Sequence, residues 1–276
     1  MTISSLTLNT GASIPQLGLG TYSLNGDAGA AAIATAIELG YRHFDTAVRY
    51  GNEDAVGEGI RRSGIDRAEV FITTKLDGPF QGDDRAIAGL EGSLKRLGTD
   101  YVDLLLMHWP MPERGLYVST WHTFEKLHDD GRARAIGVSN FKPTHLDTLL
   151  ADSDVVPAVN QIEINPHVTR PAQRAYDAEH GILTESWSPL GGGGARVLDE
   201  PVLGELAERH GRTRGQVVLR WHLQLGLVVI PKSRNPERMR ENLDVFDFEL
   251  SDDDLAAIAT LSRGPDAGVD SDRIGH

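Results

Sequence analysis

Amphipathic stretches alternate with short apolar runs along most of this chain, and a glycine repeatedly stands between the two. The amphipathic stretches include AAAIATAIEL, IAGLEGSLKRL, WHTFEKLHDD, AQRAYDAEH and QVVLRWHLQL. The glycines that end them are Gly40, Gly98, Gly131, Gly181 and Gly226. Because glycine readily takes the left-handed conformation that ends helices, the pattern predicts a repeated unit of helix, glycine and strand.

The apolar runs predict eight strands, at QLGLGT, HFDTA, VFITTKL, VDLLLMHW, ARAIGVS, PAVNQIEIN, ILTESWS and LVVIP. Most lack strict alternation, which is typical of parallel strands covered on both faces. Eight strand–helix units in about 250 residues indicate the α/β class and a (β/α)8 TIM barrel. An open doubly wound sheet is the alternative, but Ser23 stands where the third glycine of its dinucleotide fingerprint belongs after Gly18 and Gly20.

The two ends of the chain carry additional elements. SSLTLNTGASIPQ predicts a small hairpin that closes the bottom of the barrel, with its turn at Asn9, Thr10 and Gly11. SDDDLAAIATL predicts a capped extra helix, and the polar tail of residues 264–276 is expected to be loose. No linker composition interrupts the chain, so residues 1–276 are predicted to form a single domain.

The amino-acid composition excludes several kinds of chemistry but says less about the fold. The 276 residues are 40% hydrophobic and 24% charged, which excludes disorder and coiled coils. Cysteine is absent, which excludes thiolate nucleophiles, cysteine-ligated zinc and iron–sulfur clusters. The opening residues do not resemble a signal peptide, and the net charge of -13 disfavours nucleic-acid and membrane partners. We therefore expect a cytoplasmic monomer.

Polar and ionisable residues occur at the ends of successive predicted strands. In a barrel the carboxyl ends of all strands meet on one face, where active sites lie. Each residue alone fits a solvated edge, but their joint placement favours a functional site. The residues are Asp45, Lys75, His108, Ser139, Asn140, Gln161, Glu163, Trp187, Lys232 and Ser233, with Tyr50 just after the second strand.

Three long motifs now make a family resemblance specific. GYRHFDTAVRYGNEDAVG at 40–57, RAIGVSNF at 134–141 and IPKSRNPERMRENLDV at 230–245 resemble the three signatures of the aldo-keto reductases, in the same order. ESWSPL and VLRWHLQLG are similar to the bacterial 2,5-diketo-D-gluconate reductase branch. The resemblance implies an oxidoreductase that uses NADPH to reduce aldehydes and ketones, such as small dicarbonyls or keto-sugars, to alcohols.

The resemblance assigns four catalytic residues. It implies Tyr50 as proton donor, Lys75 and Asp45 as the pair that tunes it, and His108 beside the substrate carbonyl. Hydride addition to a carbonyl creates an alkoxide, which needs a proton and a hydrogen-bonding environment. Tyrosine is a weak acid with a pKa of about 10, and a nearby ammonium lowers that pKa while a carboxylate holds the ammonium in place.

The hydride must come from a bound cofactor, because no thiol is present and the patch of His122, Glu125 and His128 fits a solvated helix face better than a metal site. The resemblance implies NADPH. Trp187 is expected to stack on its nicotinamide, and Ser139, Asn140 and Gln161 to bind the carboxamide. The residues expected to pass over the pyrophosphate are Ser188, Leu190 and Gly191.

A basic cluster within this acidic chain indicates a phosphate site. Lys232, Ser233, Arg234 and Arg238 suit an adenosine 2′-phosphate, which favours NADPH over NADH. Glu241 and Asn242 match the family's contacts on the adenine side. The residues expected to line the substrate pocket are Tyr22, His108 and Trp109. Asp77 stands where close relatives often have an aromatic residue, and we expect it to weaken binding of acidic sugars.

Two other functions remain open from sequence. The same scaffold can bind NADPH tightly with little turnover, as a regulatory or sensor protein. A barrel hydrolase could use paired carboxylates such as Asp45 and Glu163. The hydrolase leaves the basic cluster of residues 232–238 without a role.

Overall fold

Eight parallel strands curve around a common axis in the computed structural model, which describes residues 3–192 and 196–275. Neighbours in the chain are neighbours in the sheet, in the order β3 to β10. The strands are β3 (Leu19–Gly20), β4 (His43–Asp45), β5 (Phe71–Leu76), β6 (Leu104–Met107), β7 (Ile136–Ser139), β8 (Val159–Glu163), β9 (Leu183–Trp187) and β10 (Val228–Val229).

The sheet closes on itself between its first and last strands. Leu17, just before β3, forms a parallel bridge with Val229 of β10. The Gly18 amide donates to the Val229 carbonyl at 2.9 Å, and the Val229 amide donates to the Gln16 carbonyl at 2.9 Å. The fold is therefore the predicted (β/α)8 TIM barrel.

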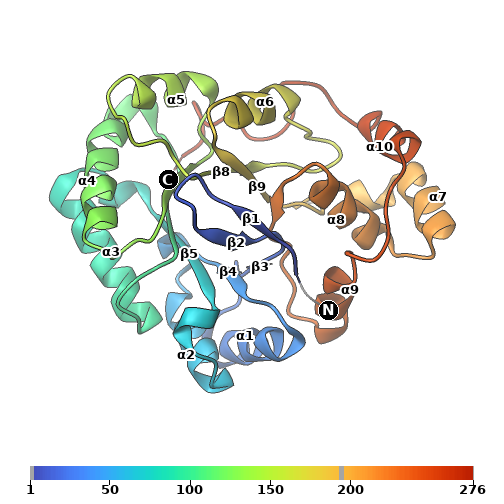
Figure 1. Ribbon diagram of the computed structural model, residues 1–276, viewed down its shortest axis with the longest axis horizontal. Helices are drawn as coiled ribbons and strands as arrows, with labels where there is room; N and C mark the ends of the chain where they lie inside the picture. The colour runs from blue at the N-terminus through green and yellow to red at the C-terminus, as the bar shows by residue number, and fades with distance from the viewer. Residues whose placement is uncertain (1–2, 193–195, 276) are drawn as a thin grey trace.

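Helices form a ring around this sheet (Figure 1). They are α1 (Gly26–Leu39), α2 (Glu53–Ser63), α3 (Asp83–Leu97), α4 (Tyr117–Asp129), α5 (Pro143–Leu150), α6 (Pro171–Glu179), α7 (Pro201–His210), α8 (Arg214–Gln224), α9 (Pro236–Leu243) and α10 (Asp252–Ala259). Short 3-10 helices are η1 (Val48–Tyr50), η2 (Arg67–Glu69), η3 (Gly78–Phe80), η4 (Pro112–Arg114) and η5 (Val197–Asp199). Within the described ranges, no helix is long and apolar enough to cross a membrane.

The glycines that separate helices from strands take the predicted left-handed conformation. Their φ values are 111° at Gly40, 67° at Gly98, 73° at Gly131, 70° at Gly181 and 73° at Gly226. A residue with a Cβ atom resists this conformation, so each glycine stops its helix and redirects the chain toward the next strand.

A two-stranded hairpin covers the end of the barrel where the strands begin (Figure 1). β1 (Ser5–Thr7) pairs antiparallel with β2 (Ser13–Pro15), as predicted. Leu8 and Ile14 pack with Phe71, Leu104 and Val228 in one buried cluster. This packing closes the bottom of the barrel and leaves the opposite end for chemistry.

The tail after Gly264, which we expected to be loose, is held by polar contacts across 264–275. The Lys142 ammonium lies 2.5 Å from a carboxylate oxygen of Asp270 and 2.5 Å from one of Asp272. The Val269 amide donates to Glu163 Oε2 at 2.9 Å. These partners lie more than 100 residues away in sequence, so local composition could not indicate them.

Replacing Lys142 with Met should release this tail without unfolding the barrel. The lysine is partly exposed, and exposed ion pairs contribute about 0–1 kcal/mol each, so the free energy of unfolding should change by roughly 1 kcal/mol. Hydrogen–deuterium exchange in the tail should become faster, while exchange in β5 and β6 stays unchanged. Lys126→Met, which removes an exposed lysine without a tail contact, is the control. Equal exchange in the tails of both variants would contradict the prediction.

Candidate active site

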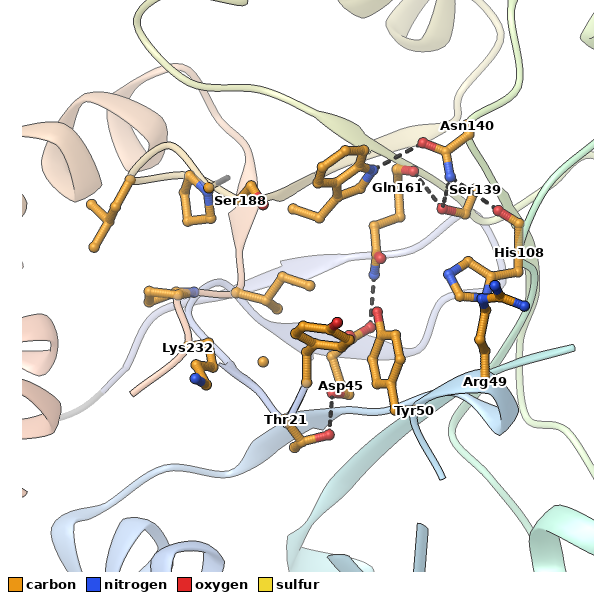
Figure 2. A pocket seen from close by; sticks show the side chains of 18 of the residues that line it. Thr21, Asp45, Arg49, Tyr50, His108, Ser139, Asn140, Gln161, Ser188 and Lys232 are labelled. Carbon is orange, nitrogen blue, oxygen red and sulfur yellow. Dashed lines mark hydrogen bonds between the residues drawn. The ribbon is translucent and has the colours of Figure 1, made fainter. Parts of the chain in front are cut away.

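A cavity of about 700 Å³ opens at the carboxyl ends of the barrel strands. Figure 2 shows side chains from most of the barrel strands and the loops after them converging on this space. The lining residues are Gly20, Thr21, Tyr22, Asp45, Arg49, Tyr50, His108, Trp109, Ser139, Asn140, Gln161, Trp187, Ser188, Pro189, Leu190, Gly191, Gly192, Ile230, Pro231 and Lys232. The cavity therefore brings together most of the residues that the sequence predicted.

The loop that carries Tyr50 is fixed by the buried side chain of Asn52. Asn52 Nδ2 donates to the Thr21 carbonyl at 2.7 Å and to the Leu24 carbonyl at 3.1 Å. Its Oδ1 accepts a hydrogen bond from the Thr46 hydroxyl at 2.9 Å. This side chain ties η1 to the loop after β3, so Tyr50 is held on a rigid segment.

Asp45, Lys75 and Tyr50 form a chain of contacts at the floor of the cavity. The Lys75 ammonium donates to Asp45 Oδ1 at 2.5 Å, to the Thr46 carbonyl at 3.0 Å and to the Tyr50 hydroxyl at 3.3 Å. Both charged side chains are buried, with 1% of each residue exposed. Because all three ammonium hydrogens have acceptors, the side chain of Lys75 has one preferred position.

Burial determines how these groups titrate. It raises the pKa of Tyr50 above its ordinary value, and the opposing effect of the Lys75 ammonium is smaller. For Lys75 burial works to lower the pKa, but attraction to Asp45 and Tyr50 outweighs it and the pKa is raised. The lowering effect of the ammonium that the sequence predicted is present, but desolvation is the larger effect, so the pKa of Tyr50 is raised overall. Tyr50 remains a neutral phenol at neutral pH.

Two aromatic rings contact the ring of Tyr50 edge to face. The ring of His108 lies 5.9 Å from that of Tyr50, and the ring of Tyr22 lies 5.3 Å from it, both edge to face. Trp109 stacks beside His108 at 6.3 Å, and Gln81 Nε2 donates to its carbonyl at 2.8 Å. The three predicted substrate residues thus lie on the cavity wall next to Tyr50.

A hydrogen-bonded group of side chains forms the wall facing Tyr50 (Figure 2). Trp187 Nε1 donates to Asn140 Oδ1 at 2.9 Å, and Asn140 Nδ2 donates to Ser139 Oγ at 3.1 Å and to the His108 carbonyl at 3.0 Å. The Ser139 hydroxyl donates to the Gln161 carbonyl at 2.7 Å. This network fixes the edge of Trp187 and leaves its ring along the cavity.

Gln161 connects this wall to Asp45 and to a residue that sequence reasoning missed. Gln161 Nε2 donates to Asp45 Oδ2 at 2.8 Å and to Glu185 Oε2 at 2.8 Å. Glu185 is fully buried. Alternation along β9 offered a signal, because Leu183, Glu185 and Trp187 share one face of a strand.

The basic cluster lies at the start of α9. Lys232, Arg234 and Arg238 are exposed, and the ion pairs within the described chain include none of them. Asn235 caps the helix by accepting hydrogen bonds from the amides of Glu237 at 2.8 Å and Arg238 at 3.3 Å. Three exposed cations beside a helix N-terminus suit an anion.

Other predicted cofactor residues frame the same region. Lys232 lines the cavity, and Ser188, Leu190 and Gly191 line it as well. Ser233 and Asn242 are buried next to the cluster, whereas Glu241 is exposed. Their sequence positions place Glu241 and Asn242 in α9, one turn beyond Arg238.

The cavity fits an extended anionic dinucleotide. It runs from Tyr50 to Lys232, and part of its wall is backbone at Gly20, Gly191 and Gly192. A Cβ atom on Gly20 would come within 2.9 Å of the Ile230 carbonyl oxygen, so the two segments can approach this closely only with glycine. The basic residue Lys232 lies at one end of the cavity and the Tyr50 hydroxyl at the other.

Arg49, which sequence reasoning also missed, faces the cavity where Asp77 was expected to act. Arg49 lines the cavity, and Asp77 does not. One Asp77 carboxylate oxygen lies 3.8 Å from Arg49 Nη1. Asp77 itself is buried, with 8% of the residue exposed. The charge presented to a ligand at this wall is therefore the partly exposed guanidinium.

The residues considered for metal binding and for hydrolysis have other partners. His122 contacts Glu125 at 3.1 Å and Asp152 at 2.7 Å on the surface, and no metal-binding group of three side chains occurs among the described residues. Glu163 is absent from the cavity wall and accepts a hydrogen bond from the tail. The carboxylate pair of Asp45 and Glu163 that a hydrolase would need is therefore not formed in the cavity.

Comparisons with known proteins agree with this geometry. The model of the "Aldo/keto reductase family" matches residues 16–263. Morphine 6-dehydrogenase of Pseudomonas putida is 49% identical, covering 96% of this chain and 93% of its own. 2,5-Diketo-D-gluconic acid reductase B of a Corynebacterium species is 48% identical, covering 95% and 94%. A crystal structure of a Gox0644 mutant in complex with NADPH superposes with a TM-score of 0.94 at 43% identity, covering 100% of both chains.

Proposed function

This chain belongs to the aldo/keto reductase family and is an NADPH-dependent carbonyl reductase, and we propose that Tyr50 is the proton donor of its reaction. The observation that carries the proposal is the buried contact chain in which Lys75 Nζ touches both Asp45 and the Tyr50 hydroxyl. A neutral phenol at the cavity floor can give a proton to an oxygen above it, and an adjacent ammonium stabilises the phenolate that remains.

NADPH, when bound, would supply the hydride that converts the carbonyl to an alcohol. Tyr50 gives its proton to the oxygen on which negative charge develops, and Lys75 stabilises the resulting phenolate. Asp45 holds Lys75 in position through the 2.5 Å contact. His108 lies beside the same oxygen and orients it. General acid catalysis of this kind accelerates reactions about 100- to 10,000-fold.

The remaining cavity residues, together with residues at the start of α9 and within it, bind and orient the cofactor in this proposal. When NADPH is bound, Trp187 would hold the nicotinamide ring, and Ser139, Asn140 and Gln161 would hydrogen-bond its carboxamide. Lys232, Ser233, Arg234 and Arg238 bind the 2′-phosphate. The residues assigned to the pyrophosphate are Ser188, Leu190 and Gly191, and those assigned to the adenine side are Glu241 and Asn242.

The proposed substrates are small dicarbonyls or keto-sugars, bound among Tyr22, His108 and Trp109. Support comes from the cavity volume of about 700 Å³ and from Tyr22, which lines the cavity and is 66% exposed. The test is NADPH oxidation, followed by absorbance, with methylglyoxal and a panel of aldehydes and diketones. Tight NADPH binding without oxidation across the panel would instead favour the sensor protein.

The double variant Lys232→Gly, Arg238→His should weaken NADPH binding selectively. Removing two cations from a phosphate site loses two charge-assisted hydrogen bonds of roughly 1.5–3 kcal/mol each, so KM for NADPH should rise at least about 100-fold. KM for NADH should change less than about threefold, because NADH lacks the 2′-phosphate. Steady-state kinetics with both cofactors measure the ratio, with Arg61→Gly on the surface of α2 as control. Equal changes in the two KM values would disprove the phosphate assignment.

We further propose that residues 1–276 form one domain and that the protein works as a cytoplasmic monomer without nucleic-acid or membrane partners. The net charge of -13 supports the last point, since its field repels phosphate groups. Size-exclusion chromatography with light scattering tests the oligomeric state directly.

A further inference from the structure

Glu185 is a buried carboxyl group for which the reaction described above has no role. It is 0% exposed, and its Oε2 accepts a hydrogen bond from Gln161 Nε2 at 2.8 Å. The same nitrogen donates to Asp45 Oδ2 at 2.8 Å. His43 Nε2 lies 3.7 Å from Glu185 Oε1 and 3.0 Å from the Thr73 hydroxyl. Glu185 is thus one amide group away from Asp45.

The charges that face Glu185 are already balanced without it. The Lys75 ammonium is paired with the Asp45 carboxylate. His43 is neutral, because burial lowers its pKa to about 3. The pKa of Glu185 is raised to about 8, first by burial and then by the Asp45 charge, while the Gln161 hydrogen bond and Lys75 act in the opposite direction. An ionised Glu185 would be an uncompensated buried charge, so the group is a neutral acid at pH 7.

The two carboxyl groups together determine which way the Gln161 amide points. An ionised carboxylate such as Asp45 can only accept hydrogen bonds, so the NH2 group of Gln161 must face it. The second hydrogen of that NH2 group is used by Glu185. The oxygen Oε1 is then the part of the amide left for the cavity, which Gln161 lines. Gln161 therefore presents an acceptor there, and the NH2 of a carboxamide is its complementary donor.

We propose that Glu185 is a positioning residue for carbonyl reduction: with Asp45 it holds the Gln161 amide in one orientation, so that Oε1 receives the carboxamide of the cofactor and Nε2 steadies Asp45 behind Lys75. The inference rests on the proposed function of the cavity. Glu185 touches neither substrate nor cofactor in it, and acts through Gln161.

Two substitutions separate the hydrogen bond from the bulk of the side chain. Glu185→Gln keeps an acceptor oxygen for Gln161, so kcat and KM for NADPH at pH 7 should stay within about twofold. Glu185→Leu keeps the volume but removes the acceptor, so kcat should fall about tenfold and KM for NADPH should rise severalfold. Ser186→Ala removes a buried hydroxyl from the other face of β9 and should change neither value by more than about twofold. Equal kcat and KM values for Glu185→Leu and Ser186→Ala would overturn the proposal.

The pH dependence distinguishes positioning by a neutral acid from a purely structural role. In the wild type, ionisation of Glu185 as pH passes about 8 places a second negative charge near Asp45. That charge favours the Lys75 ammonium and disfavours the Tyr50 phenolate, so kcat should begin to fall. Glu185→Gln lacks this ionisation, and the alkaline fall in kcat should move up by at least one pH unit. Superimposable pH profiles would overturn the proposal.

Stability measurements test the protonation of Glu185 without any activity. Between about 4.5 and about 8 the unfolded chain releases a proton that the folded chain keeps, so rising pH destabilises the wild type relative to Glu185→Gln. The Tm of Glu185→Gln should therefore rise relative to that of the wild type from pH 5 to pH 8. A difference in Tm that stays constant over this range would contradict a neutral Glu185. If the wild type shows no reductase activity, the proposed function fails, while this experiment still decides the state of Glu185.

Discussion

Replacing Tyr50 with Phe should lower kcat for carbonyl reduction by about 100- to 10,000-fold, the range that general acid catalysis contributes. The substitution removes one hydroxyl and keeps the ring, whose edge contacts with Tyr22 and His108 should persist. KM for NADPH should remain within about twofold of the wild-type value, because the Tyr50 hydroxyl contacts Lys75 and not the basic cluster of residues 232–238. Stopped-flow measurement of NADPH oxidation under single-turnover conditions isolates the chemical step.

The matched control for this variant is Tyr101→Phe. Tyr101 lies beneath the guanidinium groups of Arg67 and Arg134, away from the cavity wall, and its ring provides that contact without the hydroxyl. Its kcat should equal that of the wild type. A Tyr50→Phe enzyme that retains near wild-type kcat would show that another group, with His108 the first candidate, supplies the proton.

Local sequence was sufficient to predict the barrel because five of the units carry their own stop signal, a glycine at the end of the helix. Gly98 and Gly226 end their helices whatever the rest of the chain does, since the left-handed backbone conformation is a local property. Eight repeats of the unit then leave few alternatives to a closed parallel sheet. The (β/α)8 architecture therefore followed from patterns no longer than about 15 residues.

The part of the site that sequence missed depends on register between strands. Gln161 and Glu185 lie directly opposite each other in the pairing of β8 with β9, whereas Asp45 comes from β4 across the barrel. The spacing of these residues along the chain does not indicate that Gln161, Glu185 and Asp45 come into contact. Desolvation also cannot be predicted from local sequence. Tyr50 follows β4 in a loop that looks exposed in sequence, yet the closed barrel buries it enough to raise its pKa.

Replacing Lys75 with Met should damage both stability and catalysis. Lys75 and Asp45 are each 1% exposed, so the substitution leaves a buried carboxylate without its counter-charge. Loss of one partner of such a pair costs about 3–5 kcal/mol of unfolding free energy. In a chain of this size that corresponds to a fall in Tm on the order of 10 °C. The kcat should also fall at least about 100-fold, because Tyr50 loses the cation that stabilises its phenolate.

The double variant Asp45→Asn, Lys75→Met separates these two effects. With neither charge present, the buried site holds a neutral amide that still accepts from Gln161, so most of the lost unfolding free energy should return. Activity should not return, because the phenolate of Tyr50 remains unstabilised. Urea denaturation and kcat measured on both variants test this, with Lys95→Met on the exposed face of α3 as control. A double variant no more stable than Lys75→Met would mean that the lysine stabilises the barrel by packing its alkyl chain and that the charge pair makes no net contribution to folding.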